Sequence, residues 1–314
     1  MKVVSVINCK GGVGKTTVTA NLAAYVASQG KRVLMIDLDP QTSLTLSFID
    51  KVKWEKEYAQ NKTLRNFFDP ILRDNSMPLL RDLIIPLNNV APFLKPKGKK
   101  PGKMDIISSH LGLLDVDINL AFNLVAPNPV LAAAKFLKCY NYLRQGIDGV
   151  KEDYDLVLID CPPNLSISVK NAITASDYFI VPARMDYLSV LGVEAVDRYV
   201  KEYVEEYENN MKLANDNSSL PVSAKMLGII PTMVTIMSGE PISTLKVVMD
   251  YLKGKGYHLF RWLKENATVF AAAPATGIPV VLKAPNLKAR LTWNGIKKEL
   301  GELGQDFMDK AGIK

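Results

Sequence analysis

A glycine-rich segment at residues 8–17, NCKGGVGKTT, constrains the fold of this chain more than any other feature. It follows a run rich in Val and Ile at residues 2–8, which predicts a buried parallel strand. It precedes a helical pattern at residues 16–30, whose apolar residues share one face and which ends at Gly30. In such a strand–loop–helix unit, the backbone N–H groups of the loop and the helix N-terminus can surround phosphate oxygens. We therefore predict a phosphate-binding loop.

The segment matches the pattern G-x-x-x-x-G-K-[ST] at each fixed position except the first, where Cys9 replaces glycine. The pattern assigns Lys15 to the β- and γ-phosphates and the Thr16 hydroxyl to Mg²⁺, and Thr17 is placed to bond the α-phosphate. The expected nucleotide-binding residues of the loop are Gly11, Gly12, Val13, Gly14, Lys15, Thr16 and Thr17. A phosphate-binding loop needs only one lysine, so Lys10 requires a separate explanation.

Two further apolar runs end in the carboxylates that a nucleotide hydrolase needs for its metal ion and its water. LVLID at residues 156–160 ends in Asp160, an arrangement that anchors a water on Mg²⁺. LMIDLDP at residues 34–40 contains Asp37 and Asp39, which would share one face of a strand because side chains repeat every second residue. An isolated pair of this kind can be a turn or a cap. Beside a phosphate loop, we expect both carboxylates to face the same crevice.

Strand-like and helical segments alternate along the rest of the chain. Strands are predicted at 31–41, 104–109, 154–160, 178–183 and 226–232, and helices at 129–146, 165–175, 189–211, 240–253 and 285–310. This alternation predicts a single doubly wound α/β domain over residues 1–314, with a mostly parallel sheet flanked by helices. Charged patches and prolines at about residues 48–103 predict a short helical insertion with a basic loop.

The composition excludes several other classes of protein. The 314 residues are 48% hydrophobic, enough for a substantial core, but no apolar run approaches the ~20 residues of a membrane span. The first strand leads directly into the glycine loop, so a secretory signal is not expected. Cys9, Cys139 and Cys161 are far apart and form no CxxC, which favours a reducing, cytoplasmic compartment over a disulfide framework. Two histidines do not support a histidine-rich metal centre.

Three motifs together resemble one family. KGGVGKTT, VLMIDLDPQ and DLVLIDCPPNLS are similar to segments of the deviant Walker A ATPases of the ParA/Soj partition group, which also includes MinD and the nitrogenase iron protein. The resemblance implies a P-loop ATPase fold with ATP and Mg²⁺ as cofactors. It implies that Asp39 polarises the attacking water, and that Asp37 and Asp160 support Mg²⁺ through water, next to Thr16.

The resemblance also implies the remaining site residues. Pro231 and Thr232, in GIIPTMVT, would border adenine, and Asn266, in KENATV, would contact it. Two subunits of the family sandwich two ATP molecules, so Lys10 would cross the interface to the partner's phosphates and act in catalysis with Lys15. A second cation near the γ-phosphate neutralises charge that develops during phosphoryl transfer. The resemblance thus implies a homodimer that assembles on ATP.

Charge and resemblance together favour a role in DNA partition. The formal net charge of +7 and the pI of about 9.1 permit an anionic partner. In the family, an ATP-bound dimer binds DNA non-specifically, and a ParB-like centromere-binding protein stimulates hydrolysis. The candidate DNA-binding residues are Lys97, Lys99 and Lys100, in FLKPKGKKPGK at 93–103, and Lys288, Arg290, Lys297 and Lys298. An ordinary solvated surface is the alternative for each of them.

Two departures from the family pattern bear on this role. Many relatives place an arginine that touches DNA after the adenine-side asparagine, whereas this chain has Thr268 there, so we expect a rebuilt DNA surface that involves the loop at 95–103. The first strand begins at residue 2, so an N-terminal helix-turn-helix and site-specific repression are not expected. The expected location is the cytoplasm, with nucleoid association when ATP is bound.

The alternative function is a MinD-like ATPase that positions a membrane-bound or protein cargo. Membrane binding requires a C-terminal amphipathic helix with a basic polar face. Leu300, Leu303, Phe307 and Met308 fall on one side of the tail, but Gly301 and Gly304 weaken a free helix, and Glu299, Glu302, Asp306 and Asp309 oppose anionic lipid. We therefore expect a closing helix packed on the core, and no membrane partner. A reductase of the iron-protein type is not expected either, because the cysteines lack the required pattern.

Overall fold

The computed structural model of the protein describes residues 1–96, 98, 100–216, 219–286 and 288–314. Within these residues a seven-stranded sheet has the order β3-β4-β2-β5-β1-β6-β7. All neighbouring strands in it are parallel except β3 and β4, which confirms the predicted doubly wound, mostly parallel architecture. The strands are β1 (Lys2–Val6), β2 (Arg32–Asp37), β3 (Ile85–Pro86), β4 (Lys103–Ile107), β5 (Leu156–Asp160), β6 (Tyr178–Arg184) and β7 (Lys225–Thr232). A separate hairpin pairs β8 (Ile236–Met237) with β9 (Glu240–Pro241).

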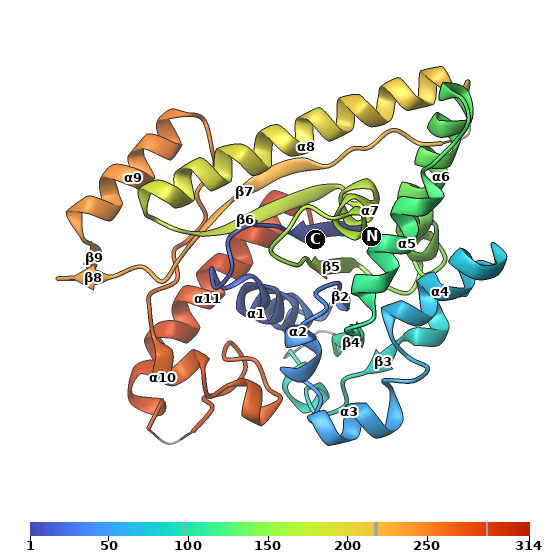
Figure 1. Ribbon diagram of the computed structural model, residues 1–314. Helices are drawn as coiled ribbons and strands as arrows, with labels where there is room; N and C mark the ends of the chain where they lie inside the picture. Colours follow the sequence, from blue (N-terminus) through green and yellow to red (C-terminus); the bar gives the residue numbers. More distant parts are fainter. Residues whose placement is uncertain (97, 99, 217–218, 287) are drawn as a thin grey trace.

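Helices cover both faces of the sheet (Figure 1). They are α1 (Lys15–Ser28), α2 (Ser43–Leu46), α3 (Lys51–Glu57), α4 (Leu64–Asp74), α5 (Leu113–Asn123), α6 (Pro129–Asp148), α7 (Ile167–Ala175), α8 (Tyr187–Leu213), α9 (Ser243–Gly254), α10 (Ala267–Phe270) and α11 (Arg290–Ala311). Alternate residues of β5 point to opposite faces of the sheet and pack against different helices. Leu156 and Leu158 pack with α1 and α11, whereas Val157 and Ile159 pack with α4 to α8. Burial of both faces explains the continuous apolar runs of the central strands.

The segment at 48–103, for which the sequence predicts a short helical insertion with a basic loop, contains helices and one short strand. It contains α3, α4 and two 3₁₀ turns at Leu80–Leu83 and Ala91–Phe93, and β3 extends the sheet antiparallel to β4. The sequence did not predict β3, because two residues are too few for an alternating pattern. Lys97 and Lys99 lie outside the described residues, and Lys100 is exposed.

The C-terminal helix α11 packs on α1, as expected for a closing helix (Figure 1). Its apolar residues Leu300, Leu303, Phe307 and Met308 are buried in the core beneath it. Gly304 has a specific role in this packing, because a Cβ there would lie 2.3 Å from the ring of Tyr25. Among the described residues, no helix combines the length and apolarity that crossing a membrane requires.

Replacing Gly304 with alanine is expected to destabilise the fold by about 1–3 kcal/mol, because the added methyl group would push Tyr25 away from α11. Gly301→Ala is the matched control. A Cβ at that position meets Tyr25 at an ordinary 3.8 Å, so the substitution causes no clash. This variant should be more stable than wild type by up to about 1 kcal/mol, because alanine favours the helix more than glycine does. Urea unfolding measures both variants. Equal stability of the two proteins would show that the close approach of α1 and α11 at Gly304 is not a constraint.

Candidate nucleotide-binding site

The carboxyl ends of three central strands form the edge on which the predicted site lies. In the parallel register, Asp160 of β5 pairs with Val6 of β1 on one side and with Asp37 of β2 on the other. The glycine loop leaves β1 at this edge and leads directly into α1, whose first residue is Lys15. Ligands of open α/β sheets bind outside the carboxyl ends of the strands. The fold therefore brings the loop and the two strand-end aspartates together.

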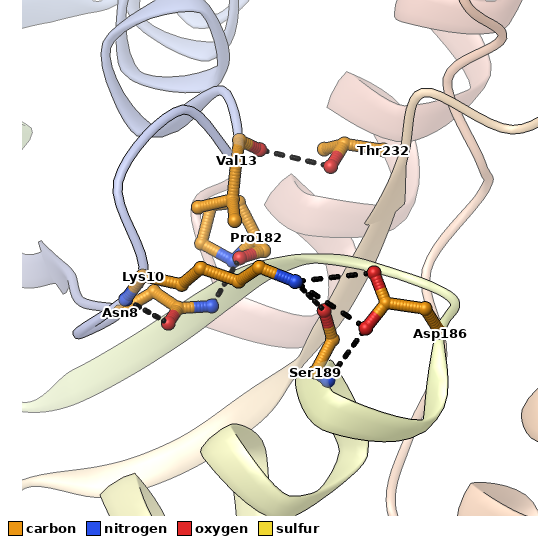
Figure 2. Close-up of polar contacts among 7 residues, drawn as sticks. All are labelled: Asn8, Lys10, Val13, Pro182, Asp186, Ser189 and Thr232. Carbon is orange, nitrogen blue, oxygen red and sulfur yellow. Dashed lines mark hydrogen bonds and ion pairs between the residues drawn. The ribbon is translucent and has the colours of Figure 1, made fainter.

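The loop adopts a conformation that only glycine tolerates well at two positions. Gly12 and Gly14 have φ angles of 69° and 86°, in the left-handed region. Two side chains fix the loop to neighbouring strands (Figure 2). The Thr232 hydroxyl at the end of β7 donates to the Val13 carbonyl at 2.8 Å, and the Asn8 amide donates to the Pro182 carbonyl of β6 at 2.8 Å. These two hydrogen bonds tie the loop to β7 and β6.

Lys15 lies inside the loop, with its side chain buried. Its ammonium donates to the Asn8 carbonyl at 3.1 Å and the Lys10 carbonyl at 3.4 Å. Burial lowers the pKa of Lys15 below its ordinary value, and the negative charges of Asp160 and Asp39 oppose this shift. An incoming phosphate group would compensate this desolvated cation directly. Lys15 therefore lies at the start of α1 with its ammonium against the backbone of the loop.

Thr16 and Asp160 meet at the head of α1. The Thr16 hydroxyl donates to one carboxylate oxygen of Asp160 at 2.7 Å, and the Thr19 hydroxyl donates to the other at 3.1 Å. The pKa of Asp160 is raised to about 6, because the effect of burial exceeds the opposing effect of the two hydroxyl hydrogen bonds. The structure thus joins two of the three predicted metal-site residues. Thr19 is an additional partner that lies one helical turn after Thr16.

Asp37 and Asp39 take different environments, so they do not share a strand face as the sequence suggested. The strand β2 ends at Asp37, whose carboxylate accepts from Thr45 N–H at 2.8 Å and from the Thr45 hydroxyl at 2.6 Å. Asp39 lies in the following turn, where its carboxylate accepts from Gln41 N–H at 2.9 Å. Asp39 is partly exposed, whereas Asp37 is fully buried. Asp39 is therefore the one of the two that can approach a water.

The pKa of Asp37 predicts how stability depends on pH in the nucleotide-free protein. Burial and the neighbouring Asp160 raise this pKa to about 8, although the hydrogen bonds from Thr45 lower it. Between pH 6 and 8 the folded state then holds a proton that the unfolded state has lost. The free energy of unfolding should therefore fall as pH rises through this window, by up to about 1.4 kcal/mol per pH unit. Urea unfolding of wild type and Asp37→Asn at several pH values tests this. A flat wild-type profile, or an unchanged slope in the variant, would contradict it.

A cavity of about 160 Å³ opens beside the loop, and its walls include two residues for which the family resemblance implies an adenine contact. Its walls include Gly14, Thr17, Thr232, Asn266 and Phe270. The Asn266 side-chain oxygen accepts from Val269 N–H at 2.9 Å and so caps α10 at the cavity wall. Pro231 is buried one residue earlier in β7, where its carbonyl accepts from Leu263 N–H at 2.8 Å. The structure thus brings two of the three predicted adenine-side residues, Thr232 and Asn266, to the cavity wall.

The Lys10 side chain points toward Asp186 and Ser189 at the start of α8 (Figure 2). Its ammonium lies 3.1 Å and 3.3 Å from the two carboxylate oxygens of Asp186 and 3.2 Å from the Ser189 hydroxyl. The backbone N–H of Lys10 donates to the Asn8 side-chain oxygen at 2.9 Å. Sequence reasoning did not include Asp186 or Ser189 in the site. The available signal was the Asp-x-x-Ser spacing before a helical pattern, which is typical of an N-cap.

Four of the predicted DNA-binding residues lie on α11 or just before it. Arg290, Lys297 and Lys298 lie on α11, and Lys288 lies two residues before it; all four are exposed. The Lys298 ammonium is 3.8 Å from Glu302, and the Lys297 ammonium lies 4.8 Å from the centre of the Trp293 ring. Arg290 and Lys297 are seven residues apart, which puts them on the same side of the helix. The structure thus brings these two onto one surface.

The fold and the site together define a P-loop nucleotide-binding protein. Comparisons with known proteins show which family of P-loop proteins the chain belongs to. A family model described as an AAA domain matches residues 1–213. The sporulation initiation inhibitor protein Soj of Bacillus subtilis (strain 168) is 26% identical over 304 residues, which cover 96% of this chain and 99% of Soj. The chain belongs to this AAA-domain family, and within it to the ParA/Soj-type partition ATPases of the ParA/MinD superfamily.

Solved structures agree with this fold. An ATP complex of an aspartate-to-alanine variant of Cyanothece McdA has a TM-score of 0.68 at 21% identity, and the match covers 100% of this chain and 97% of that one. A plasmid partition protein of Borrelia burgdorferi B31 bound to AMPPNP has a TM-score of 0.64 at 21% identity, over 98% of this chain and 99% of that one. At these identities the likeness concerns the fold.

Proposed function

We propose that this chain hydrolyses ATP with Mg²⁺, dimerises around ATP, binds DNA without sequence preference and segregates a plasmid or chromosome. The observation that carries the proposal is the single sheet edge at which Lys15, Thr16, Asp160 and Asp39 converge. These are the groups that phosphoryl transfer requires: a cation for the phosphates, oxygen ligands for the metal ion and a carboxylate for the attacking water. A ParB-like partner would stimulate hydrolysis and so release the DNA.

The donor groups at this edge fit Mg²⁺. Thr16 and Asp160 offer adjacent oxygen atoms, and Mg²⁺ prefers one or two protein oxygens completed by waters and substrate phosphates. Asp160 is buried, and its burial raises its pKa even though the Lys15 ammonium lowers it, so a metal ion at this position would stabilise the charged carboxylate. Thr16 would hold the ion, and Asp160 and Asp37 would act through water. When bound, Mg²⁺ supplies charge neutralisation on the β- and γ-phosphates.

The remaining groups would position the substrate. The cavity beside Gly14 has mainly apolar walls, which suit a flat base. The oxygen of the Asn266 amide caps α10, so its nitrogen is the group that could donate to a purine ring nitrogen. The partly exposed Asp39 would orient a water for attack on the γ-phosphate. The adenine contact and the role of Asp39 are both part of the proposal.

Exposed apolar side chains next to the site support a dimer that closes over it. The Ser109 hydroxyl donates to the Asp39 carbonyl at 2.6 Å, so the segment entering α5 lies beside the site. Leu111 and Leu114 follow it and are 59% and 51% exposed. Tyr187 and Leu188, next to the anchor of Lys10, are 73% and 68% exposed. Exposed apolar patches of this kind mark interaction surfaces, and a second copy facing this edge would cover them.

The basic residues of α11 support an electrostatic contact with DNA. Arg290 and Lys297 share one side of the helix, and Lys288 precedes it. Non-specific binding needs only such a basic surface along the phosphate backbone. The MinD-like alternative receives less support, because the apolar side of α11 is buried on the core rather than available to lipid. Nucleoid association in the ATP-bound state follows from the proposal.

The proposal is tested by binding the protein to random-sequence duplex DNA and to anionic liposomes. Each assay is run with ATP, with ADP and without nucleotide, at two salt concentrations. The expected result is DNA binding that requires ATP and weakens steeply with salt, and no binding to liposomes. Replacing both Arg290 and Lys297 with alanine should weaken DNA binding, and Lys53→Ala on α3 is the control. Liposome binding without DNA binding would move the protein to the MinD-like class, and binding to neither would reject the DNA role.

A further inference from the structure

Lys10 is held through both its backbone and its side chain. Its backbone N–H is bound by Asn8, which is itself tied to β6 through the Pro182 carbonyl. Its ammonium is bound by both carboxylate oxygens of Asp186 and by the Ser189 hydroxyl (Figure 2). In this position the ammonium is directed at the subunit's own α8 rather than outward. Releasing it requires only rotation of the lysine side chain, since the loop backbone is already fixed.

The anchor for Lys10 is formed by the cap of α8 and does not depend on Lys10. Asp186 is the N-cap residue, and its side chain accepts from the Ser189 backbone N–H at 2.8 Å. Ser189 is buried, at 2% exposure, so its hydroxyl has a fixed position. Partial burial raises the pKa of Asp186, but the hydrogen bonds from Ser189 and Lys10 outweigh this and hold it below its usual value. The carboxylate therefore stays charged at neutral pH.

The ion pair between Lys10 and Asp186 is strong enough to favour this position of the lysine side chain and weak enough to break when another anion competes for it. The side chains of Lys10 and Asp186 are 40% and 46% exposed, so solvent screens the ion pair. Exposed pairs of this kind change an equilibrium by roughly two- to fivefold. A triphosphate carries more negative charge than one carboxylate and can offer Lys10 several acceptor oxygens. An approaching subunit with bound ATP would thus compete successfully for the ammonium.

We propose that Asp186, together with Ser189, is a positioning residue that holds Lys10 on its own subunit until the ATP of a second copy takes it over. The inference rests on the ATP-dependent dimer of the proposed function and adds a restraint on when that dimer forms. Without ATP, the contact with Asp186 therefore keeps Lys10 bound to its own subunit. Dimer formation then includes the exchange of one ion pair for another at each Lys10.

The variant Asp186→Asn separates the hold from the helix cap. Asparagine caps helices about as well as aspartate, so α8 should stay intact while the charge that binds Lys10 is lost. The expected result is a dimer dissociation constant with ATP that is roughly two- to fivefold lower than in wild type, measured by sedimentation equilibrium. The matched control is Asp250→Asn on α9, which removes the carboxylate 3.6 Å from Lys253 and makes the same change in net charge. An unchanged or weaker Asp186→Asn dimer would overturn the proposal.

A second measurement tests the hold without any dimer. In the nucleotide-free protein, an amine-acylating reagent followed by mass spectrometry reports how accessible each lysine is. Lys10 should be labelled roughly two- to fivefold faster in Asp186→Asn and faster in Ser189→Ala, with Lys53 unchanged in both. Equal labelling of Lys10 in all proteins would show that Asp186 does not hold it. If wild type fails to dimerise with ATP while labelling responds as expected, the dimer of the proposed function fails and the hold is a contact within the monomer only.

Discussion

Replacing Lys15 with alanine is expected to weaken ATP binding about 100-fold or more, because two hydrogen bonds from a charged group to phosphate contribute about 1.5–3 kcal/mol each. The Lys15 ammonium is buried inside the loop, where its present partners are backbone carbonyls of Asn8 and Lys10. It would exchange these neutral acceptors for phosphate oxygens. Isothermal titration calorimetry with ATP and Mg²⁺ measures the loss directly.

Lys15→Met is the matched control for the folding of the loop. Methionine keeps an unbranched apolar chain in the same space but carries no charge, so it should lose ATP affinity as fully as alanine does. Thermal unfolding of both variants should remain close to that of wild type, because burial already disfavours the charged form of this lysine. Retention of wild-type affinity in either variant would remove Lys15 from the phosphate site.

Replacing Asp39 with alanine is expected to lower the rate of ATP hydrolysis about 100-fold or more, since a positioned carboxylate that handles the water's proton contributes about 10²–10⁴. ATP binding should persist. The Asp39 carboxylate accepts only from Gln41 N–H in the structure's described contacts, and its removal takes one negative charge away from the triphosphate. The ATP-bound state should therefore accumulate. Single-turnover hydrolysis and ATP affinity are measured on the same preparation.

Asp39→Asn distinguishes a chemical role from a structural one. The amide oxygen can still accept from Gln41 N–H and preserve the turn, whereas the charge is gone. Loss of turnover in both variants supports the assignment to the attacking water. Normal hydrolysis in Asp39→Ala would refute the assignment, and normal hydrolysis in Asp39→Asn alone would reduce Asp39 to a residue that shapes the turn.

The parts of the site that could be predicted from sequence are those set by local chain geometry. The strand–loop–helix unit, the apolar run ending in Asp160 and the alternating elements all reflect short-range periodicity, and the structure places them as expected. Helix ends were less accurate. The helix predicted at 189–211 is α8, which starts at Tyr187 because Asp186 caps it. The helix predicted to start at 240 begins at Ser243, because Glu240 and Pro241 form β9.

The contacts that sequence could not supply join distant segments. The hydrogen bond from Thr232 to the Val13 carbonyl joins residues 219 positions apart in the sequence, and the contact between Lys10 and Asp186 joins residues 176 positions apart. Local patterns contain no information about which strand end faces which loop. Asp37 shows a second limit of prediction from sequence. The two-residue alternation of side chains applies only within a strand, and β2 ends at Asp37. The turn after β2 then separates Asp37, bound by Thr45, from the more exposed Asp39.

We expect ATP, and not ADP, to join two copies of this chain through Lys10. Sedimentation velocity with Mg²⁺ and ATP tests it most directly, with the Asp39→Ala variant used to prevent turnover. The expected result is a dimer with ATP, a monomer with ADP, and a monomer with ATP when Lys10→Ala is added, even though that double variant still binds nucleotide. A monomer under all three conditions, or a dimer that forms regardless of the nucleotide and of Lys10, would show that Lys10 does not link ATP binding to dimer formation.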